Sequence, residues 1–161
     1  MEGGESKEPL ESAGVTGGSP VRSVSFTLTR GTQGNDHILD LTRELQAGIQ
    51  ETGIRTGQAV AMVVGSTAAL TATEFEPGLV EEDLAATLER IAPRDGRYLH
   101  EETWNDDNGH SHVRASLVGP SLALPVVEGR VPLGTWQQIV LMDFDTRPRT
   151  REIVVNVMGA G

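Results

Sequence analysis

Short runs of alternating apolar and polar residues are the feature that most restricts the fold of this chain. Between Ser23 and Arg30, the apolar residues Val24, Phe26 and Leu28 alternate with serine and threonine. A period of two residues is typical of a β-strand with one buried face. Similar or strongly apolar runs predict further strands over residues 37–41, 58–64, 68–74, 122–126, 134–144 and 151–158. We therefore expect a fold in which strands outnumber helices.

Three other segments have the residue spacing of helices. Thr42 is a suitable N-cap for a helix that ends at Gly53, and leucines at helical spacing predict a second helix over residues 79–92. Residues 110–118 predict a short helix, and the turn at 31–36 predicts a hairpin between the first two strands. The sequence thus predicts an α+β fold with mixed, largely antiparallel β-sheets, two longer helices and one short helix.

Length, charge and the absence of cysteine restrict the class of protein. A chain of 161 residues is expected to form a single domain, here residues 21–161, after a disordered N-terminal tail at 1–20 that is rich in Gly, Ser and Glu. The absence of cysteine excludes disulfides and a cysteine nucleophile, and the net charge of -10 argues against nucleic-acid binding. Since the sequence shows neither a signal peptide nor an apolar run of about 20 residues, we expect a cytoplasmic protein without membrane contact.

Titratable side chains are concentrated between Asn105 and Ser121. This segment holds two acids, two amides, two histidines and an arginine, and three of the four histidines lie between His100 and His112. Imidazole and carboxylate groups suit a divalent metal, either Zn or Mg. The candidate ligands are His100, His110, His112 and one carboxylate, Asp107 or its neighbour Asp106.

The backbone conformation decides whether His110 and His112 can hold the same ion. On a strand their side chains share a face, whereas on a helix they diverge by about 200°. A shared ion therefore requires extended backbone, or a helix that only begins there. The alternative is that these residues cap a helix and cover the surface.

The helix predicted after residue 108 is also a candidate phosphate site. A helix N-terminus presents free N–H groups to an anion. Asn108 would cap this helix, and Arg114 in its early turns could bind a phosphate through two hydrogen bonds. The alternative for Arg114 is a surface ion pair with Glu101 or Glu102.

Residues 65–74 form a second candidate binding segment, with the sequence G-S-T-A-A-L-T-A-T-E. Small residues let a ligand approach the backbone closely, and Ser66 and Thr67 supply hydroxyl groups. Glu74 at the end of the following strand could act as a general base. The alternative is an ordinary hairpin with a solvated glutamate.

These segments together resemble the YjbQ family of small bacterial and archaeal proteins, from about Phe26 to Val157. The residues that carry the resemblance are I-L-D-L-T-R (38–43), T-A-A-L-T-A-T-E (67–74), R-I-A-P (90–93), His100, D-N-G-H-S-H-V-R-A-S-L-V-G-P-S (107–121) and L-G-T-W-Q-Q-I (133–139). The last two segments are the most specific. One position departs from the family pattern, because many members have a histidine where this chain has Gly65.

The resemblance implies an α+β fold that assembles as a homotrimer, and a weak, secondary thiamine-phosphate synthase activity. That reaction joins a pyrimidine diphosphate to a thiazole phosphate and releases pyrophosphate, so a divalent metal and phosphate-binding groups would suit it. The site residues implied by the matching motifs are Glu74, His100, Asp107, Asn108, His110, His112 and Arg114, with Gly119 and Ser121 near the phosphate or structural.

Three functions follow as hypotheses. The first is a homotrimer that binds a phosphorylated heterocycle with a divalent metal and forms thiamine phosphate, with Glu74 or His112 moving protons and Arg114 holding a phosphate. The second is a non-enzymatic trimer that binds a ligand or a metal, which the absence of a histidine at Gly65 favours. The third is a metal-dependent hydrolase.

Overall fold

The computed structural model describes residues 20–161, and the elements in that range confirm the expected α+β class with antiparallel sheets. The predicted disordered tail at 1–20 lies outside the described residues except for Pro20, and the first strand begins at Arg22. None of the helices in residues 20–161 has the length and apolar character needed to cross a bilayer.

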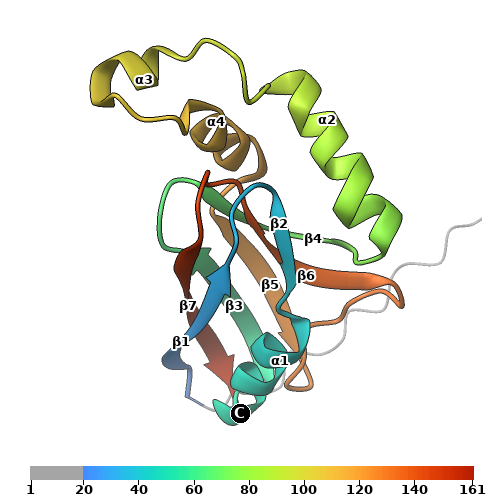
Figure 1. The fold of residues 1–161 in the computed structure, drawn as a ribbon. Coiled ribbons are helices and arrows are strands. Elements are labelled where there is room, and N and C mark those ends of the chain that lie inside the picture. The colour runs from blue at the N-terminus through green and yellow to red at the C-terminus, as the bar shows by residue number, and fades with distance from the viewer. Residues whose placement is uncertain (1–19) are drawn as a thin grey trace, which may run out of the picture.

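Seven strands form two antiparallel sheets within the described range. The larger sheet has the order β1–β7–β3–β5, from β1 (Arg22–Thr32), β7 (Arg149–Ala160), β3 (Thr56–Val63) and β5 (Ser121–Val127) (Figure 1). The smaller sheet has the order β2–β6–β4, from β2 (His37–Asp40), β6 (Gln137–Asp143) and β4 (Ala68–Glu74). Each predicted strand is therefore present, with bounds shifted by a few residues.

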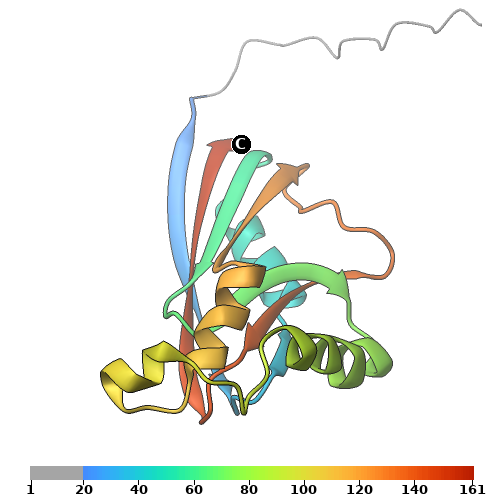
Figure 2. The ribbon, with the colours of Figure 1, turned by 90° about the horizontal axis from the view of Figure 1, so that it is seen from above.

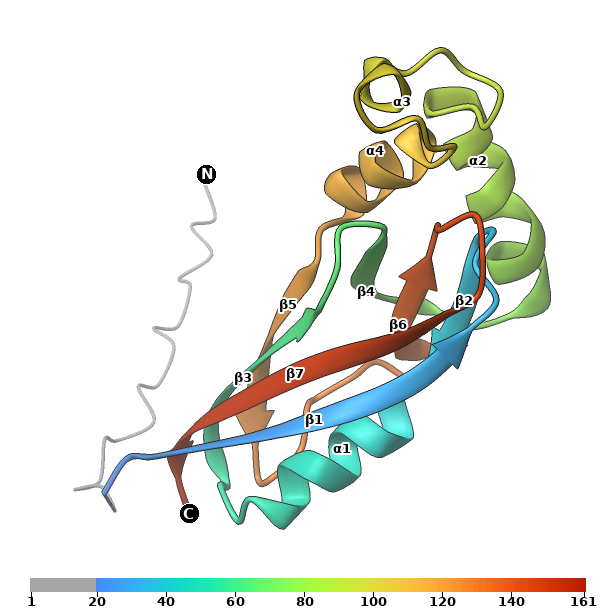
Figure 3. The same ribbon diagram turned by 60° about the vertical axis from the view of Figure 1, so that its left-hand side comes forward.

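The predicted hairpin between the first two strands is wrong. β1 pairs along its length with β7, from Arg22 opposite Gly159 to Thr32 opposite Arg149, whereas β2 pairs with β6 in the other sheet (Figure 3). The turn between β1 and β2 carries the chain from one sheet to the other. Alternation along a strand fixes which face is buried, but not which strand lies beside it.

The main core lies between the two sheets and is closed at one end by α1 (Thr42–Glu51). α1 presents Leu45 and Ile49 to this core, in agreement with the predicted helical spacing. The inward residues of β3 and β7 alternate with outward ones, as a half-buried strand requires. The fully buried members include Ala61, Val63, Ile139, Leu141, Ile153, Val155 and Val157.

A second core lies on the other face of the smaller sheet, beneath the remaining helices. The π-helical segment η1 (Gly78–Asp83) continues into α2 (Leu84–Ile91), and α4 (Gly109–Val118) packs beside β4. Helices α2, α3 and α4 gather at the end of the molecule away from the C-terminus (Figure 2). The residues of this core are Ile38, Ala69, Val80, Leu88, Ala115, Val140, Met142 and Phe144.

The number of helices departs from the prediction. Four α-helices occur in the described range, because a further helix, α3 (Leu99–Trp104), forms outside the segments predicted as helices. α3 buries none of its residues, so it leaves no apolar periodicity in the sequence. α4, expected to be the short helix, is as long as α1 at 10 residues.

The outward face of the larger sheet exposes apolar side chains. Val60 and Met62 of β3 point outward next to Val154 and Met158 of β7, and all four are exposed. Met62 lies opposite Val154 in the paired strands, so the four form one patch. Such a patch is typical of a surface that another protein chain covers.

Candidate functional site

The helices α3 and α4 bring two of the predicted histidines into contact. The ring centroids of His100 on α3 and His112 on α4 lie 4.4 Å apart, with planes tilted by 59°. Asn105, with a φ of 54°, adopts the left-handed conformation that ends α3 and allows the chain to turn back into α4. Asp106 follows this turn, and its Oδ2 lies 3.4 Å from His100 Nε2.

Two polar atoms of this cluster are buried without a hydrogen bond to the described residues. His100 Nε2 and Asp106 Oδ1 have no hydrogen-bond partner within residues 20–161. A buried polar group left unpaired costs about 1–3 kcal/mol, so each such atom calls for an explanation, of which a bound ligand is one. We therefore take the histidine pair (His100 and His112) as the centre of the candidate site.

His112 has the electrostatic character of a proton carrier. Burial lowers its pKa from the ordinary value of 6.5, and the charge of His100 lowers it further. The backbone of Ser66 and the carboxylates of Asp106 and Asp145 oppose this effect. The imidazole of His112 is therefore neutral near pH 7 and able to accept a proton.

His110 does not join the pair. The backbone is already helical at Gly109, so the side chains of residues 110 and 112 diverge by about 200°. The His110 ring is buried with its centroid 6.4 Å from that of Tyr98, and its Nε2 lies 3.3 Å from Ser111 Oγ. Burial lowers the pKa of His110 from 6.5, and the charges of Arg114 and Arg94 add to this.

The predicted carboxylate ligand also lies elsewhere. Asp107 is 72% exposed, accepts a hydrogen bond of 2.9 Å from Thr146 Oγ1 and lies 4.0 Å from Arg147, whereas Asp106 is the acid beside His100. Within residues 20–161, no group of three or more His, Asp or Glu side chains is arranged to hold a metal ion. Residues 20–161 of one chain therefore contain no three-ligand metal site.

Arg114 is held inside the protein. Its side chain is 0% exposed, and Nη1 donates to both oxygens of Asp36 at 2.8 Å. Nη2 donates to Glu89 at 2.5 Å, and Nε and Nη2 donate to the carbonyl of Ala92 at 3.0 and 2.7 Å. These contacts tie α4 to the end of α2 and to the turn before β2, so Arg114 positions the helix that carries His112.

The 65–67 turn joins β3 of the larger sheet to β4 of the smaller one. Gly65 and Ser66 are exposed, and Ser66 lies near enough to His112 to affect its pKa. Thr67 is buried, donates to Asp145 Oδ2 at 2.8 Å and accepts from Arg151 Nη2 at 2.8 Å. Of the two predicted hydroxyl groups, that of Ser66 is therefore accessible, and that of Thr67 supports the turn.

Three other predicted residues lie at or just beyond the ends of α4. Gly119 ends α4 with a φ of 103°, and its carbonyl accepts from Leu70 N at 3.0 Å. Ser121, exposed at the start of β5, pairs with Met62. Asn108 occupies the N-cap of α4 without a side-chain capping bond, and its buried Oδ1 has no partner within residues 20–161.

Glu74 lies far from the histidine pair. It is at the opposite end of β4 from the 65–67 turn, separated by about 20 Å of extended strand at ~3.3 Å per residue. There it lies opposite Gln137, in a shallow pocket of about 330 Å³ that also includes Trp136. Trp136 is 71% exposed. This pocket therefore lies on the protein surface, away from the histidine pair.

A buried ion-pair network under the turn was not anticipated from the sequence. Arg151 donates to both oxygens of Asp143, each at 2.7 Å, and Arg149 Nε lies 2.9 Å from Asp145. Burial alone would raise the pKa of Asp145, but the hydrogen bonds from Arg149 and Thr67 outweigh it and the pKa is lowered. Two acids and two arginines, each pair spaced by two residues, are the sequence signal that could have revealed it.

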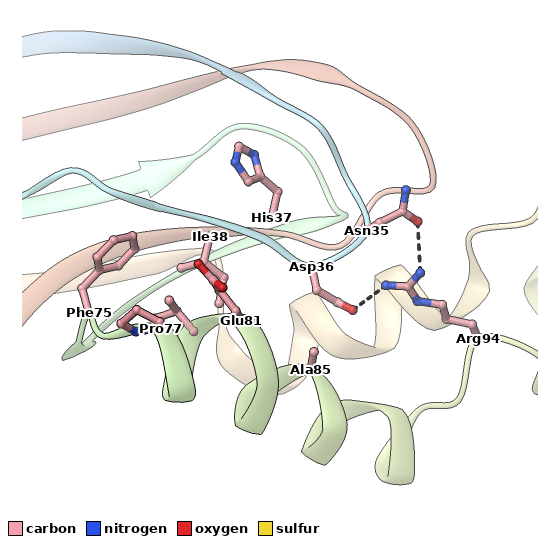
Figure 4. Close-up of a pocket in the computed structure, with 10 residues that line it drawn as sticks. Asn35, Asp36, His37, Ile38, Phe75, Pro77, Glu81, Ala85 and Arg94 are labelled. Atoms are coloured by element: carbon pink, nitrogen blue, oxygen red, sulfur yellow. Dashed lines mark hydrogen bonds and ion pairs between the residues drawn. The ribbon is translucent and has the colours of Figure 1, made fainter.

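Two further pockets differ in size and in position. The smaller, about 220 Å³, lies between the 65–67 turn and the end of α4 and is lined by Met62, Gly65, Ser66, Ala68, Ala115, Ser116 and Pro120. The larger, about 540 Å³, lies between β2 and η1, where Arg94 binds Asp36 and Asn35 and Phe75 and Pro77 form the apolar wall (Figure 4). We call the smaller one the turn pocket, and it is lined by Ser66, whose backbone affects the pKa of His112.

Proteins of known structure share this arrangement of sheets and helices. A YbjQ-like protein of unknown function from Sulfolobus solfataricus superposes with a TM-score of 0.76 at 28% identity, covering 86% of this chain and 99% of its own. A YjbQ/UPF0047 protein from Clostridium acetobutylicum superposes with a TM-score of 0.71 at 31% identity, covering 83% of this chain and 98% of its own. The fold is thus that of small YjbQ-like α+β proteins.

Sequence comparison gives the same result. The family described as "UPF0047 protein YjbQ-like" matches residues 26–160. Relatives include a UPF0047 protein of Synechocystis, 32% identical over 90% of this chain and 98% of its own length, and YugU of Bacillus subtilis, 36% identical over 83% and 98%. The chain belongs to the YjbQ/UPF0047 family, which confirms the resemblance inferred from its motifs.

Proposed function

We propose that this chain forms a homotrimer, binds a small phosphorylated heterocycle at the histidine pair and the turn pocket, and forms thiamine phosphate there at a low rate. The observation that carries this proposal is the contact of His100 with His112 beside the exposed Ser66. An acid–base pair next to a pocket with hydroxyl groups suits the transfer of a phosphorylated group.

In the proposed reaction, the thiazole nitrogen forms a bond to the methylene carbon of the pyrimidine. The carbon–oxygen bond to diphosphate breaks, and the diphosphate leaves with the electron pair. His100 is the group proposed to donate a hydrogen bond or a proton to the leaving oxygen, and neutral His112 is proposed to donate a hydrogen bond there. Ser66 is proposed to orient a phosphate, whereas Glu74 and Arg114 have no part because one is distant and the other is buried.

The divalent metal enters the proposal with the substrate. The described residues of one chain supply no group of three ligands, so no step depends on a metal held by the protein. Mg²⁺ is commonly bound through substrate phosphates with few protein ligands. We therefore propose that magnesium arrives on the diphosphate.

The homotrimer is proposed to assemble through the apolar patch on the larger sheet. This patch consists of Val60, Met62, Val154 and Met158, which are exposed in one chain. Met62 also lines the turn pocket. Assembly through this patch would therefore place the pocket at a subunit boundary and shield it from water.

The test is thiamine phosphate formation by the purified full-length protein with both substrates and magnesium. We expect slow formation by the wild type and at least a tenfold loss in the His100→Ala and His112→Ala variants, since acid–base groups contribute about 10²–10⁴-fold. His37→Ala is the matched control, because His37 lies on β2 outside the pair. No product from the wild type, or equal rates in all variants, would remove the proposed activity.

A second candidate is ligand binding without turnover. The absence of an imidazole at Gly65 and the incomplete ligand set within one chain favour it. Thermal shifts with thiamine phosphate, thiazole phosphate and divalent ions would distinguish the two, because a bound ligand stabilises the folded protein. Stabilisation of the wild type without any product supports binding alone, and product formation excludes it.

A further inference from the structure

Gly65 lies directly against a buried arginine. Its φ of 118° belongs to a conformation that residues with a side chain rarely adopt. A Cβ atom added to Gly65 would lie 2.9 Å from Arg151 Nη1. Gly65 lines the turn pocket, and it has no side chain to cover this edge of the guanidinium.

The guanidinium of Arg151 is held in a fixed orientation by other atoms. Its side chain is 7% exposed, and Nε and Nη2 donate to the two oxygens of Asp143 at 2.7 Å. Nη2 also donates to Thr67 Oγ1 at 2.8 Å. Within residues 20–161, the hydrogen bonds of Arg151 thus use Nε and Nη2, and the Nη1 edge is the one that faces Gly65.

The backbone of the turn adds two further donors. Val64 N donates to Glu152 O at 2.8 Å, and Phe144 N donates to Thr67 O at 2.9 Å, so both sides of the turn are anchored. Between these anchors, the N–H groups of Gly65 and Ser66 take part in none of the hydrogen bonds among residues 20–161. Backbone N–H groups that no protein acceptor occupies are able to bind an anion.

We propose that Arg151 Nη1 and the N–H groups of Gly65 and Ser66 form a subsite for the phosphate monoester of the ligand. This inference rests on the proposed function, which identifies the part of the ligand beyond the phosphate. The guanidinium supplies charge-assisted hydrogen bonds, and the turn supplies neutral ones. Arg151 therefore takes the phosphate-binding role that the sequence suggested for Arg114.

The size and charge of the turn pocket define the ligand class. At about 220 Å³, the pocket is smaller than the range of about 300–1,000 Å³ that is usual for complete small-molecule sites. A pocket of this size suits a phosphate and the carbon attached to it, and the remainder of the ligand would extend out of the pocket. Asp143 and Asp145 balance the charges of Arg151 and Arg149, so binding depends on directed hydrogen bonds rather than on net positive charge.

The test uses inorganic phosphate as the probe and isothermal titration calorimetry on the full-length protein. Gly65→Ala introduces a Cβ against Nη1, and we expect phosphate affinity to fall by about tenfold or more, the value of a lost charge-assisted hydrogen bond. Gly129→Ala is the matched control, since Gly129 also has a positive φ, of 77°, but its nearest atom would be 3.8 Å away. Circular dichroism checks that each variant is folded.

A second variant decides the question if Gly65→Ala does not fold. Ser116→Leu fills the turn pocket from the exposed face of α4 without changing the turn. We expect the same loss of phosphate affinity in this variant. Wild-type affinity in either folded pocket variant, an equal loss in Gly129→Ala, or no phosphate binding by the wild type would overturn the proposal.

The outcome separates this subsite from the proposed activity. Phosphate binding that Gly65→Ala abolishes, in a protein that forms no thiamine phosphate, supports the subsite and removes the activity. Thiamine phosphate formation that depends on His112 but is unchanged in Gly65→Ala supports the activity and overturns the subsite.

Discussion

Replacing Arg114 by methionine tests whether this residue supports the fold or binds the ligand. Arg114 donates five hydrogen bonds, to Asp36, Glu89 and the carbonyl of Ala92, from a fully buried position. Methionine has a similar length and is apolar, so it removes the charge and donors while leaving only a small cavity.

The expected cost follows from what the substitution leaves behind. The Asp36 side chain is 7% exposed, and a buried ion pair that loses one partner costs about 3–5 kcal/mol. Arg94, 2.7 Å from Asp36 Oδ2, still compensates part of the charge, and the pair with half-exposed Glu89 contributes little. We therefore expect a loss of about 3 kcal/mol, which lowers the melting temperature by on the order of 10 °C.

The assay is urea denaturation followed by circular dichroism at one fixed protein concentration. Arg90→Met is the matched control, because Arg90 is exposed on the same segment of α2 and contacts only Thr87, at 3.1 Å. We expect it to change the unfolding free energy by less than about 0.5 kcal/mol. In the double variant Arg114→Met with Asp36→Asn, the loss of unfolding free energy should be about 1–3 kcal/mol smaller than the sum of the two single losses. An Arg114→Met protein as stable as the control, but unable to bind phosphate, would refute the positioning role.

Three further predictions concern pH, assembly and one turn. Burial holds the pKa values of His110 and His112 below 6.5, so near that pH the unfolded chain binds more protons than the folded one. The free energy of unfolding should therefore fall as the pH drops below 6.5. A double substitution of the two histidines by glutamine should flatten the pH profile of urea denaturation. Met62→Glu with Val154→Lys should convert the proposed trimer to monomers of 17.2 kDa in light scattering, and an unchanged mass would exclude this face as the interface. Gly34→Ala should destabilise the protein by more than the ~1–3 kcal/mol that a strained φ costs, because the added Cβ would also meet the carbonyl oxygen of Asp145. A melting temperature equal to that of the wild type would contradict this.

The local sequence pattern predicted which segments form strands and helices better than it predicted which strands pair. The period of two in β1 and the spacing of leucines in α2 depend on burial of one face, and both elements are present as predicted. The pairing of β1 with β7 joins the two ends of the described chain, and no short-range signal specifies it. Helix α3 was missed because it contributes nothing to either core.

The clustering of histidines in the sequence predicted only part of the arrangement around α4. His100 and His112 meet as the clustering of histidines suggested, and helical backbone from Gly109 directs His110 away from them. The sequence could not reveal that Arg114 is buried, because an arginine on an amphipathic helix is equally compatible with solvent. The ligand role proposed for Arg151 depends on its closeness to Gly65. The two residues are 86 positions apart in the sequence, and only the folded chain brings them together.

The most direct test of the proposed site is a crystal structure of the protein grown with thiamine phosphate. We predict electron density for the phosphate at hydrogen-bonding distance from Arg151 Nη1 and Ser66 N, with the heterocycle extending toward the histidine pair. Clear density for the ligand in the larger pocket beside Arg94, with the turn pocket holding only water, would contradict this account.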